Sequence, residues 1–215
     1  MSRTSDIVDA LIDESGSLYS EDMGARVAQD TPQELFHWLL GSIMLSARID
    51  ARHAVEAASA LRGAGLHKIA ALRAAKWEDV VRVLNENGYA RYDESTAGYL
   101  QETAEWAETR WHGDLRGLRD AAKDADGVLG ELQDAKGLGP LGASIFAREV
   151  QLVWDVLYPR FDGPGTRTAG DLGLPGDAAE LRDMAGSRER FVRLVSALTR
   201  VALEGPGERV AALSD

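Results

Sequence analysis

The residues best suited to chemistry in this 215-residue chain lie in two glycine-rich segments. The first, Gly137-Leu138-Gly139-Pro140, joins two helical patterns, and its proline suits the first turn of the second helix. Glycines let a ligand approach the backbone closely, and a helix start offers free N–H groups, so a phosphate is the natural ligand of such a turn. A glycine-rich turn between helices is also a common structural device. The turn alone therefore leaves both interpretations open.

The second segment begins at Asp162, where Asp162-Gly163-Pro164-Gly165 precedes another helical pattern. Aspartate often caps the start of a helix, so this residue has a structural interpretation as an N-cap. The N-cap role is compatible with a second role of the carboxylate.

Taken together, three segments resemble the helix-hairpin-helix DNA glycosylases, the superfamily of endonuclease III and the adenine-mismatch glycosylase. The stretch from Leu132 to Ala143 is similar to the family's L-x-x-L-P-G-V-G-x-x-T-A hairpin. Phe161 to Leu174 is similar to its V-D-T-H-x-F-R-x-x-x-R-L-G-L motif, with Asp162, Arg167 and the final Leu-Gly-Leu in register. Leu39 to Arg48 resembles its L-L-x-x-x-L-L-S-A-Q helix and loop. The resemblance covers roughly residues 30–175, and the combination is far more specific than any one segment.

The resemblance implies that Asp162 is the catalytic residue. In the family, the matching aspartate lies beside the sugar of a flipped-out nucleotide and stabilises its cationic transition state. Cleavage of a glycosidic bond passes through an oxocarbenium-like state that a carboxylate stabilises electrostatically. We therefore expect a base-excision-repair DNA glycosylase that releases a damaged or mismatched base, with an alkylated or deaminated base as the favoured target.

The same resemblance favours a monofunctional enzyme that uses water. Family members that also cut the strand carry a lysine nucleophile in the hairpin, where this chain has Leu141. Lys136 is the only one of the four lysines near the hairpin, so a bifunctional glycosylase and lyase remains an alternative. The chain has no cysteine, which excludes a cysteine-held iron–sulfur cluster, and we expect no cofactor.

The DNA contacts implied by the resemblance gather at the hairpin. The expected set is Lys136, Gly137, Leu138, Gly139, Gly142, Arg48 and Arg167, with double-stranded DNA as the partner. Arg48 stands where relatives place a glutamine that fills the gap left by the flipped base, although it could simply be a surface arginine. Arg167 could bind the DNA backbone or be structural. No side chains suggest a metal site, but relatives bind a monovalent cation through the hairpin carbonyls, and such a cation is expected here too.

The expected base pocket comprises Ser42, Tyr89 and Tyr92. The two tyrosines lie in a loop that resembles a family loop near the site and could stack on a base, although packing in the core or loop is the more common role of such residues. Ser42 occupies the position of the acidic residue of the adenine-specific branch, so adenine-mismatch activity is not expected. Gly163-Pro164 also departs from the family's Thr-His after the aspartate.

Two non-enzymatic alternatives remain. The formal net charge of −11, together with Gly163-Pro164 and Leu141, is compatible with a DNA-structure-binding protein that has lost the chemistry. Residues 1–34 carry eight acidic and two basic side chains, and this acidic arm could instead belong to a helical protein-interaction domain. Arg48 to Asp79 is locally basic, so a DNA-binding face is compatible with the overall charge.

The predicted fold is all-α, with about ten helices in a two-lobed helix-hairpin-helix arrangement and a DNA groove between the lobes. We expect a six-helix domain over 31–155 that ends in the hairpin. The second helical lobe combines 1–30 with 156–215 and carries Asp162. Thr31-Pro32 is the expected start of a central buried helix that includes Leu35 to Leu45. The N-terminus lacks the apolar core of a signal peptide, and a monomeric, cytoplasmic protein of the bacterial nucleoid, without a membrane partner, is expected.

Overall fold

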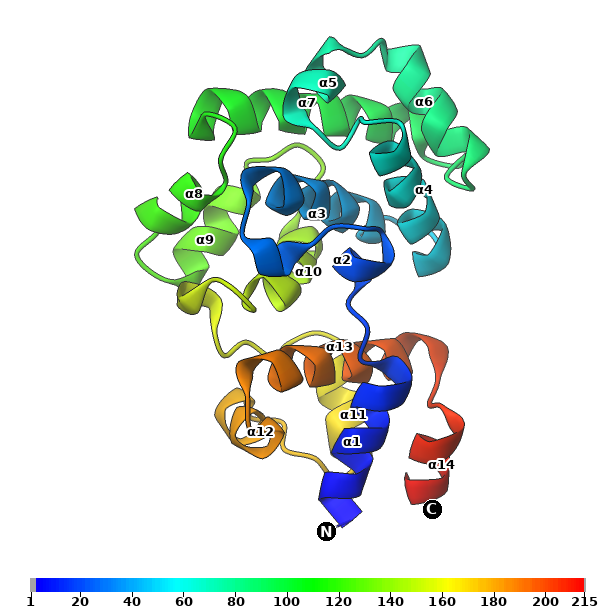
Figure 1. The fold of residues 1–215 in the computed structure, drawn as a ribbon, viewed down its shortest axis with the longest axis vertical. Coiled ribbons are helices and arrows are strands. Elements are labelled where there is room, and N and C mark those ends of the chain that lie inside the picture. The colour runs from blue at the N-terminus through cyan, green and yellow to red at the C-terminus, as the bar shows by residue number, and fades with distance from the viewer. Residues whose placement is uncertain (1–2, 215) are drawn as a thin grey trace. The chain divides into compact units, whose positions relative to one another are not determined.

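The computed structural model describes residues 3–214, and within this range the chain is entirely helical with no β-strand (Figure 1). The predicted all-α class is thereby confirmed. The described residues form more helices than expected, namely fourteen α-helices and two 3-10 helices, and several of these have only three to seven residues. None of these helices is long and apolar enough to cross a membrane.

The chain divides into two compact units, each described by itself. Unit 1 comprises Met1–Tyr19 and Leu157–Asp215, and unit 2 comprises Ser20–Val156. Residues 20–30, which we expected in the lobe of Asp162, belong to unit 2. The reason is that Asp30 accepts hydrogen bonds from Trp154 Nε1 at 3.0 Å and from Arg119 Nη1 at 3.0 Å, both within that unit.

Unit 2 contains most of the helices. They are α2 (Tyr19–Asp22, beginning at the boundary), η1 (Val27–Gln29), α3 (Pro32–Leu45), α4 (Ala51–Gly63), α5 (Ile69–Ala74), α6 (Trp77–Glu86), α7 (Asp93–Trp111), α8 (Arg116–Ala121), α9 (Ala125–Leu132) and α10 (Pro140–Val150). The short helix η2 (Asp155–Leu157) crosses the boundary. Unit 1 contains α1 (Arg3–Ser15), α11 (Gly165–Asp171), α12 (Ala178–Ala185), α13 (Arg188–Glu204) and α14 (Glu208–Ser214), and α13 packs against α1, α11 and α12.

Helix α3 is buried on all sides at the centre of unit 2, as its apolar sequence predicts. It begins directly after Thr31, with Pro32 in its first turn, and every residue from Glu34 to Met44 is buried. A helix without a solvent face needs a partner within the protein for each polar side chain. Trp38 meets this requirement by donating its indole N–H to the Phe146 carbonyl of α10 at 3.0 Å, which fixes α10 against α3.

His37 and Glu34 of α3 meet the same requirement through helix α4. The His37 Nε2 atom lies 2.9 Å from the Ala58 carbonyl and donates its proton there, which leaves Nδ1 as an acceptor facing Arg62 Nη1 at 3.4 Å. Both terminal nitrogens of Arg62 donate to the Glu34 carboxylate, at 3.0 and 3.1 Å. The ring of His67 lies 5.3 Å from that of His37. The neutral form of His37 therefore suits this site, where a cation already stands beside its ring.

Burial lowers the pKa of His37 to about 4, with the charges of His67 and Arg62 acting in the same direction. Burial also lowers the pKa of His67. Burial by itself would raise the pKa of Glu34, but hydrogen bonds from Arg62 and from the Arg26 N–H outweigh it, so this pKa is lowered. The cluster thus holds a charged Glu34–Arg62 pair beside two neutral imidazoles at neutral pH.

Unit 2 should lose stability as the solution is acidified. The unfolded chain takes up a proton at His37 near pH 6.5, whereas the folded chain takes it up only near pH 4. The contribution of this histidine to the free energy of unfolding is therefore complete above pH 6.5 and falls by about 3 kcal/mol between pH 6.5 and pH 4.

Urea unfolding at pH 7 and pH 4.5 measures the change. His37→Gln should reduce the difference between the two pH values, while His53→Gln, which removes an imidazole outside the cluster, should not. Equal differences in wild type and His37→Gln would exclude His37 as the cause.

Candidate functional site

The candidate site begins with the hairpin between α9 and α10. Helix α9 ends at Leu132, and α10 begins at Pro140 with Gly139 as its N-cap in an extended conformation. Gly137 has a φ of +81°, a backbone conformation that side chains with a Cβ rarely adopt. A Cβ on Gly137 would also lie 2.8 Å from Cδ2 of Tyr99. Both the backbone conformation and the lack of space therefore require glycine at position 137.

The hairpin leaves backbone donors exposed to a ligand. Within residues 3–214, the N–H groups of Gly137, Gly139 and Leu141 have no hydrogen-bond acceptor, and the first bond of α10 runs from the Ala143 N–H to the Gly139 carbonyl at 3.0 Å. These N–H groups belong to a turn and to the positive end of a helix dipole, a combination that favours an anion. The Lys136 carbonyl accepts the Thr103 hydroxyl at 3.0 Å, whereas the carbonyls of Gly137 and Leu138 accept no bond in the described chain.

Gly142 brings the hairpin close to the loop that follows α3. A Cβ on Gly142 would lie 2.7 Å from Leu138 Cδ1 and 3.4 Å from the Ser46 hydroxyl. Leu138 is buried beneath the turn. Arg48, two residues beyond Ser46, is exposed. The structure therefore brings the hairpin glycines and the Arg48 loop together, as the resemblance implies.

The loop of Tyr89 and Tyr92 joins the same region of unit 2. The Tyr89 hydroxyl donates to the Met44 carbonyl near the end of α3 at 3.1 Å, and a Cβ on Gly88 would lie 2.8 Å from the His53 ring at the start of α4. Burial raises the pKa of Tyr89 to about 12. Tyr89 therefore fastens this loop to α3.

The three expected base-pocket residues occupy different environments. Ser42 and Tyr89 are fully buried, and Ser42 donates to the Trp38 carbonyl of its own helix at 2.9 Å. Both side chains thus have packing roles in this structure, and neither offers a surface on which a base could stack. Tyr92 is half-buried just before α7, with the Arg91 guanidinium 5.3 Å from its ring centroid.

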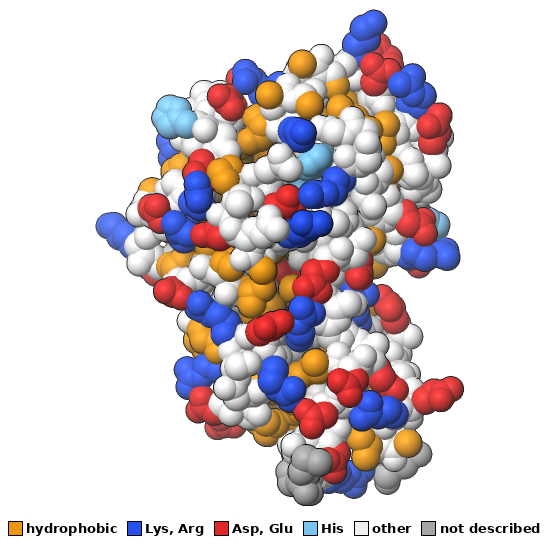
Figure 2. All heavy atoms as spheres, in the orientation of Figure 1, with side chains coloured by type: hydrophobic (Ala, Val, Ile, Leu, Met, Phe, Trp, Pro, Cys, Tyr) orange, Lys and Arg blue, Asp and Glu red, His pale blue; other side chains and the backbone are white. Residues whose placement is uncertain are grey.

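Several basic side chains of unit 2, including Lys136 of the hairpin, lack acidic partners. Six arginines elsewhere in unit 2 form ion pairs with carboxylates, namely Arg62, Arg73, Arg82, Arg110, Arg116 and Arg119. Within the described chain, none of Arg48, Arg52, Arg91 and Lys136 does so, and all four are exposed. Blue and red side chains intermingle over the face shown in Figure 2, as expected for a surface rich in ion pairs. Arg26, Lys68, Lys76 and Lys123 also form no ion pair within residues 3–214, so unpaired basic side chains occur at the hairpin and in other parts of unit 2.

Asp162 lies in unit 1, two residues before the N-cap of helix α11. Its side chain is 30% exposed, and its carboxylate pairs with the Arg160 guanidinium. The cap position of α11 is held by Pro164 without a side-chain hydrogen bond, so Asp162 does not have the N-cap role. The carboxylate is therefore accessible and held in place by an arginine.

Helix α11 packs closely on α13 through glycine. A Cβ on Gly165 would lie 3.2 Å from Leu198 Cβ and 3.2 Å from the Thr199 backbone nitrogen. Arg167 is exposed on α11, and it forms no ion pair within residues 3–214. The second motif thus fixes the backbone next to Asp162 by helix packing.

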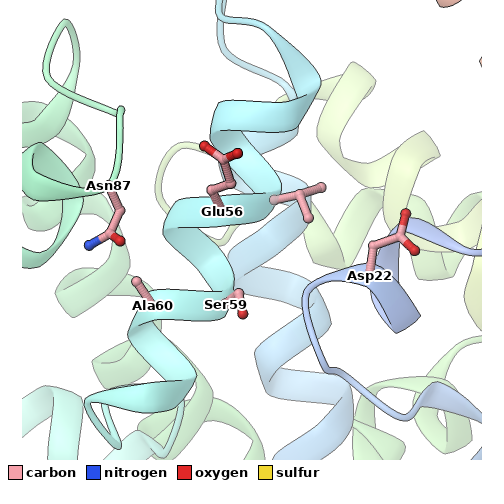
Figure 3. A pocket seen from close by; sticks show the side chains of 6 residues that line it. Asp22, Glu56, Ser59, Ala60 and Asn87 are labelled. Carbon is pink, nitrogen blue, oxygen red and sulfur yellow. The ribbon is translucent and has the colours of Figure 1, made fainter.

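Two pockets of unit 2 are lined by none of the expected site residues. One, of about 370 Å³, is lined by Asp22, Val55, Glu56, Ser59, Ala60 and Asn87, and Figure 3 shows Glu56, Ser59 and Ala60 along one stretch of α4. The other, of about 270 Å³, lies between α3, α5 and α7. No group of three or more metal-ligating side chains occurs in the described chain.

The structure adds one residue that the sequence analysis missed. Tyr99 of α7 lies against Gly137, and its ring is 36% exposed. It occupies an ordinary helical segment that carries no motif. No signal in the sequence marks it, because its neighbour one turn away, Thr103, is also brought to the hairpin only by the fold.

Two glycines of α11 provide a matched test of the packing beside Asp162. Gly165→Ala should lower the free energy of unfolding by about 1–3 kcal/mol, because the new methyl group meets the α13 backbone. Gly170→Ala, on the same helix with open space around it, should raise it by about 0.5–1 kcal/mol. Urea unfolding measures both changes, and equal effects of the two substitutions would contradict the close approach of α11 and α13.

Comparisons with known proteins do not assign this chain to a family. No family model matches it, and no match is found among curated proteins or solved structures. The resemblance to the helix-hairpin-helix DNA glycosylases therefore depends on its three short motifs, to which the structure adds the positions of their residues within each unit.

Proposed function

We propose that this protein is a DNA glycosylase that hydrolyses the N-glycosidic bond of a damaged or mismatched base. The observation that carries the proposal is the hairpin, where unpaired N–H groups follow Lys136, an exposed lysine without an acidic partner within residues 3–214, and where the loop of Arg48 lies close by. That combination suits the phosphodiester backbone of DNA, since phosphates are bound by helix N-termini and by Lys and Arg. A cytoplasmic protein of the bacterial nucleoid accords with this activity.

Asp162 supplies the chemistry in the proposed reaction. Its carboxylate stabilises positive charge on the sugar while the C1′–N bond breaks and the bonding electrons leave with the base. Water then adds at C1′, its proton passes to the carboxylate or the departing base, and an abasic site remains. The ion pair with Arg160 holds the Asp162 carboxylate in position. The same ion pair offsets part of its charge, which favours a non-catalytic DNA-binding protein as the second candidate.

Leu141 supports a monofunctional reaction, because it offers no amine where relatives that cut the strand carry lysine. Its side chain is 56% exposed in the first turn of α10. A monovalent cation would be held by the carbonyls of Gly137 and Leu138 and would add positive charge next to the bound phosphate.

Replacement of Asp162 should abolish base release without abolishing DNA binding. Wild type and Asp162→Asn are incubated with duplexes that carry uracil, thymine mismatches, hypoxanthine, alkylated purines or oxidised bases, and strand breaks are scored with and without hot alkali. Wild type should give alkali-dependent breaks on at least one duplex. Asp162→Asn should reduce the rate at least about 100-fold, because removing one electrostatic group at a reacting centre costs 10² to 10³ in rate.

Asp171→Asn is the matched control, since it makes the same change at an exposed aspartate at the end of α11. It should retain the wild-type rate. Breaks that persist in Asp162→Asn would remove the catalytic role of Asp162. DNA binding without breaks on any duplex would favour the non-catalytic candidate, and strand breaks without alkali would indicate the bifunctional one.

Leu141→Lys should create a covalent contact with DNA. A lysine amine in this position can displace the base at C1′ and form a Schiff base, which borohydride reduces to a stable protein–DNA adduct. The adduct should appear as a band of higher mass on a denaturing gel with the duplex that wild type processes, and wild type should give none.

Leu203→Lys is the control, because Leu203 is a 59% exposed leucine on α13, outside the hairpin. Equal trapping by the two lysine variants would show that the amine reacts without positioning. An adduct with wild type would show that an amine of the natural chain, rather than water, attacks the sugar.

A further inference from the structure

Helix α7 holds the hairpin at two points, one turn apart. The Thr103 hydroxyl donates to the Lys136 carbonyl at 3.0 Å. Four residues earlier, the Tyr99 ring lies so close to Gly137 that a Cβ there would stand 3.0 Å from Tyr99 Cγ. The position of the Tyr99 ring is therefore fixed relative to the free N–H groups of the hairpin.

The Tyr99 ring and the Lys136 ammonium group together face solvent. The ring is 36% exposed, and the Lys136 Nζ lies 5.9 Å from the ring centroid. This separation is at the outer limit of a cation–π contact, so the ammonium group remains available to an anion. Neither an ion pair of Lys136 nor a hydrogen bond of the Tyr99 hydroxyl is found within residues 3–214.

Exposed aromatic surface is rare in unit 2. Its large exposed apolar side chains are Trp77, Tyr99 and Leu141, and two of these three belong to the hairpin or lie against it. Trp77 donates its indole N–H to the Glu94 carbonyl at 3.3 Å, whereas the Tyr99 hydroxyl has no hydrogen-bond partner within residues 3–214. An aromatic ring beside an ammonium group fits a sugar and its phosphate, because the ring packs on the apolar sugar face and the charge meets the phosphate.

We propose that Tyr99 and Lys136 form a second DNA-backbone contact, which takes the phosphodiester and deoxyribose next to the phosphate bound by the hairpin. Lys136 pairs with the phosphate of this second contact, next to the one that the hairpin binds. The Tyr99 ring packs on the sugar, and the Tyr99 hydroxyl donates to an oxygen of the second phosphate. This inference rests on the proposed DNA-binding function. It adds a contact contributed by α7, outside the three motifs.

Salt-dependent DNA binding tests the two side chains separately. The affinity for a fluorescently labelled duplex is measured by anisotropy at several salt concentrations. Lys136→Gln should weaken binding about 3- to 10-fold at low salt and reduce the slope of log affinity against log salt by about one, as expected for one lost phosphate contact. Tyr99→Ala should weaken binding by a similar factor with an unchanged slope, and Tyr99→Phe should lie between Tyr99→Ala and wild type.

Lys123→Gln is the matched control, because Lys123 is an exposed lysine between α8 and α9, outside the hairpin. It should leave both affinity and slope near the wild-type values. Lys136 is exposed, so Lys136→Gln should fold normally. The inference can therefore be tested with this variant even if Tyr99→Ala loosens the hairpin. Circular dichroism checks the folding of both variants.

The outcomes separate this inference from the proposed function. Wild type that binds DNA, with Lys136→Gln and Tyr99→Ala indistinguishable from it, would overturn the second contact and leave the glycosylase proposal intact. An equal loss in Lys123→Gln would also overturn it, because the effect would then be general electrostatics. A wild-type protein without measurable affinity for DNA would overturn both proposals.

Discussion

The burial of helix α3 on all sides is the constraint on which unit 2 depends. The polar side chains of a helix without a solvent face cannot form hydrogen bonds to water, so each needs a hydrogen-bond partner within the protein. Trp38 donates a hydrogen bond to the Phe146 carbonyl of α10, and His37 donates one to the Ala58 carbonyl of α4. These bonds are directional, whereas apolar packing is not, and they therefore specify where α4 and α10 lie. Since α10 is the second helix of the hairpin, the position of the candidate phosphate site follows from α3.

The same requirement explains why part of the candidate site could be predicted from sequence and part could not. The start of α3 at Pro32 and the hairpin at Gly137 follow from local signals, since proline and glycine restrict or free the backbone wherever they occur. The burial of Tyr89 depends on the Met44 carbonyl, 45 residues earlier, and no local pattern encodes such a bond. Tyr99 was missed for the same reason, because only the fold brings it to Gly137.

Glycine has a packing role in both motifs in addition to its conformational one. At Gly142 and Gly165 the backbone is helical, so any residue could adopt it, yet a side chain would collide with Leu138 in one unit and with the α13 backbone in the other. Sequence analysis assigned Gly142 to phosphate binding alone. The structure shows that it also lets Leu138 pack against the start of α10, since a Cβ would lie 2.7 Å from Leu138 Cδ1. Its substitution would therefore disturb the packing of Leu138 as well as any bound ligand.

Net charge is a poor guide to whether this chain can bind DNA. A formal charge of −11 counts every arginine equally, although an arginine paired with a carboxylate contributes little field at the surface. In unit 2, Arg73 and Arg110 are paired in this way, whereas Arg48 and Lys136 are not. A phosphate responds to charges within about 10 Å at moderate salt. Its attraction to the hairpin therefore depends on the local charges, which include Lys136 and the neighbouring Asp134, and the more distant acidic surface opposes approach chiefly at low salt.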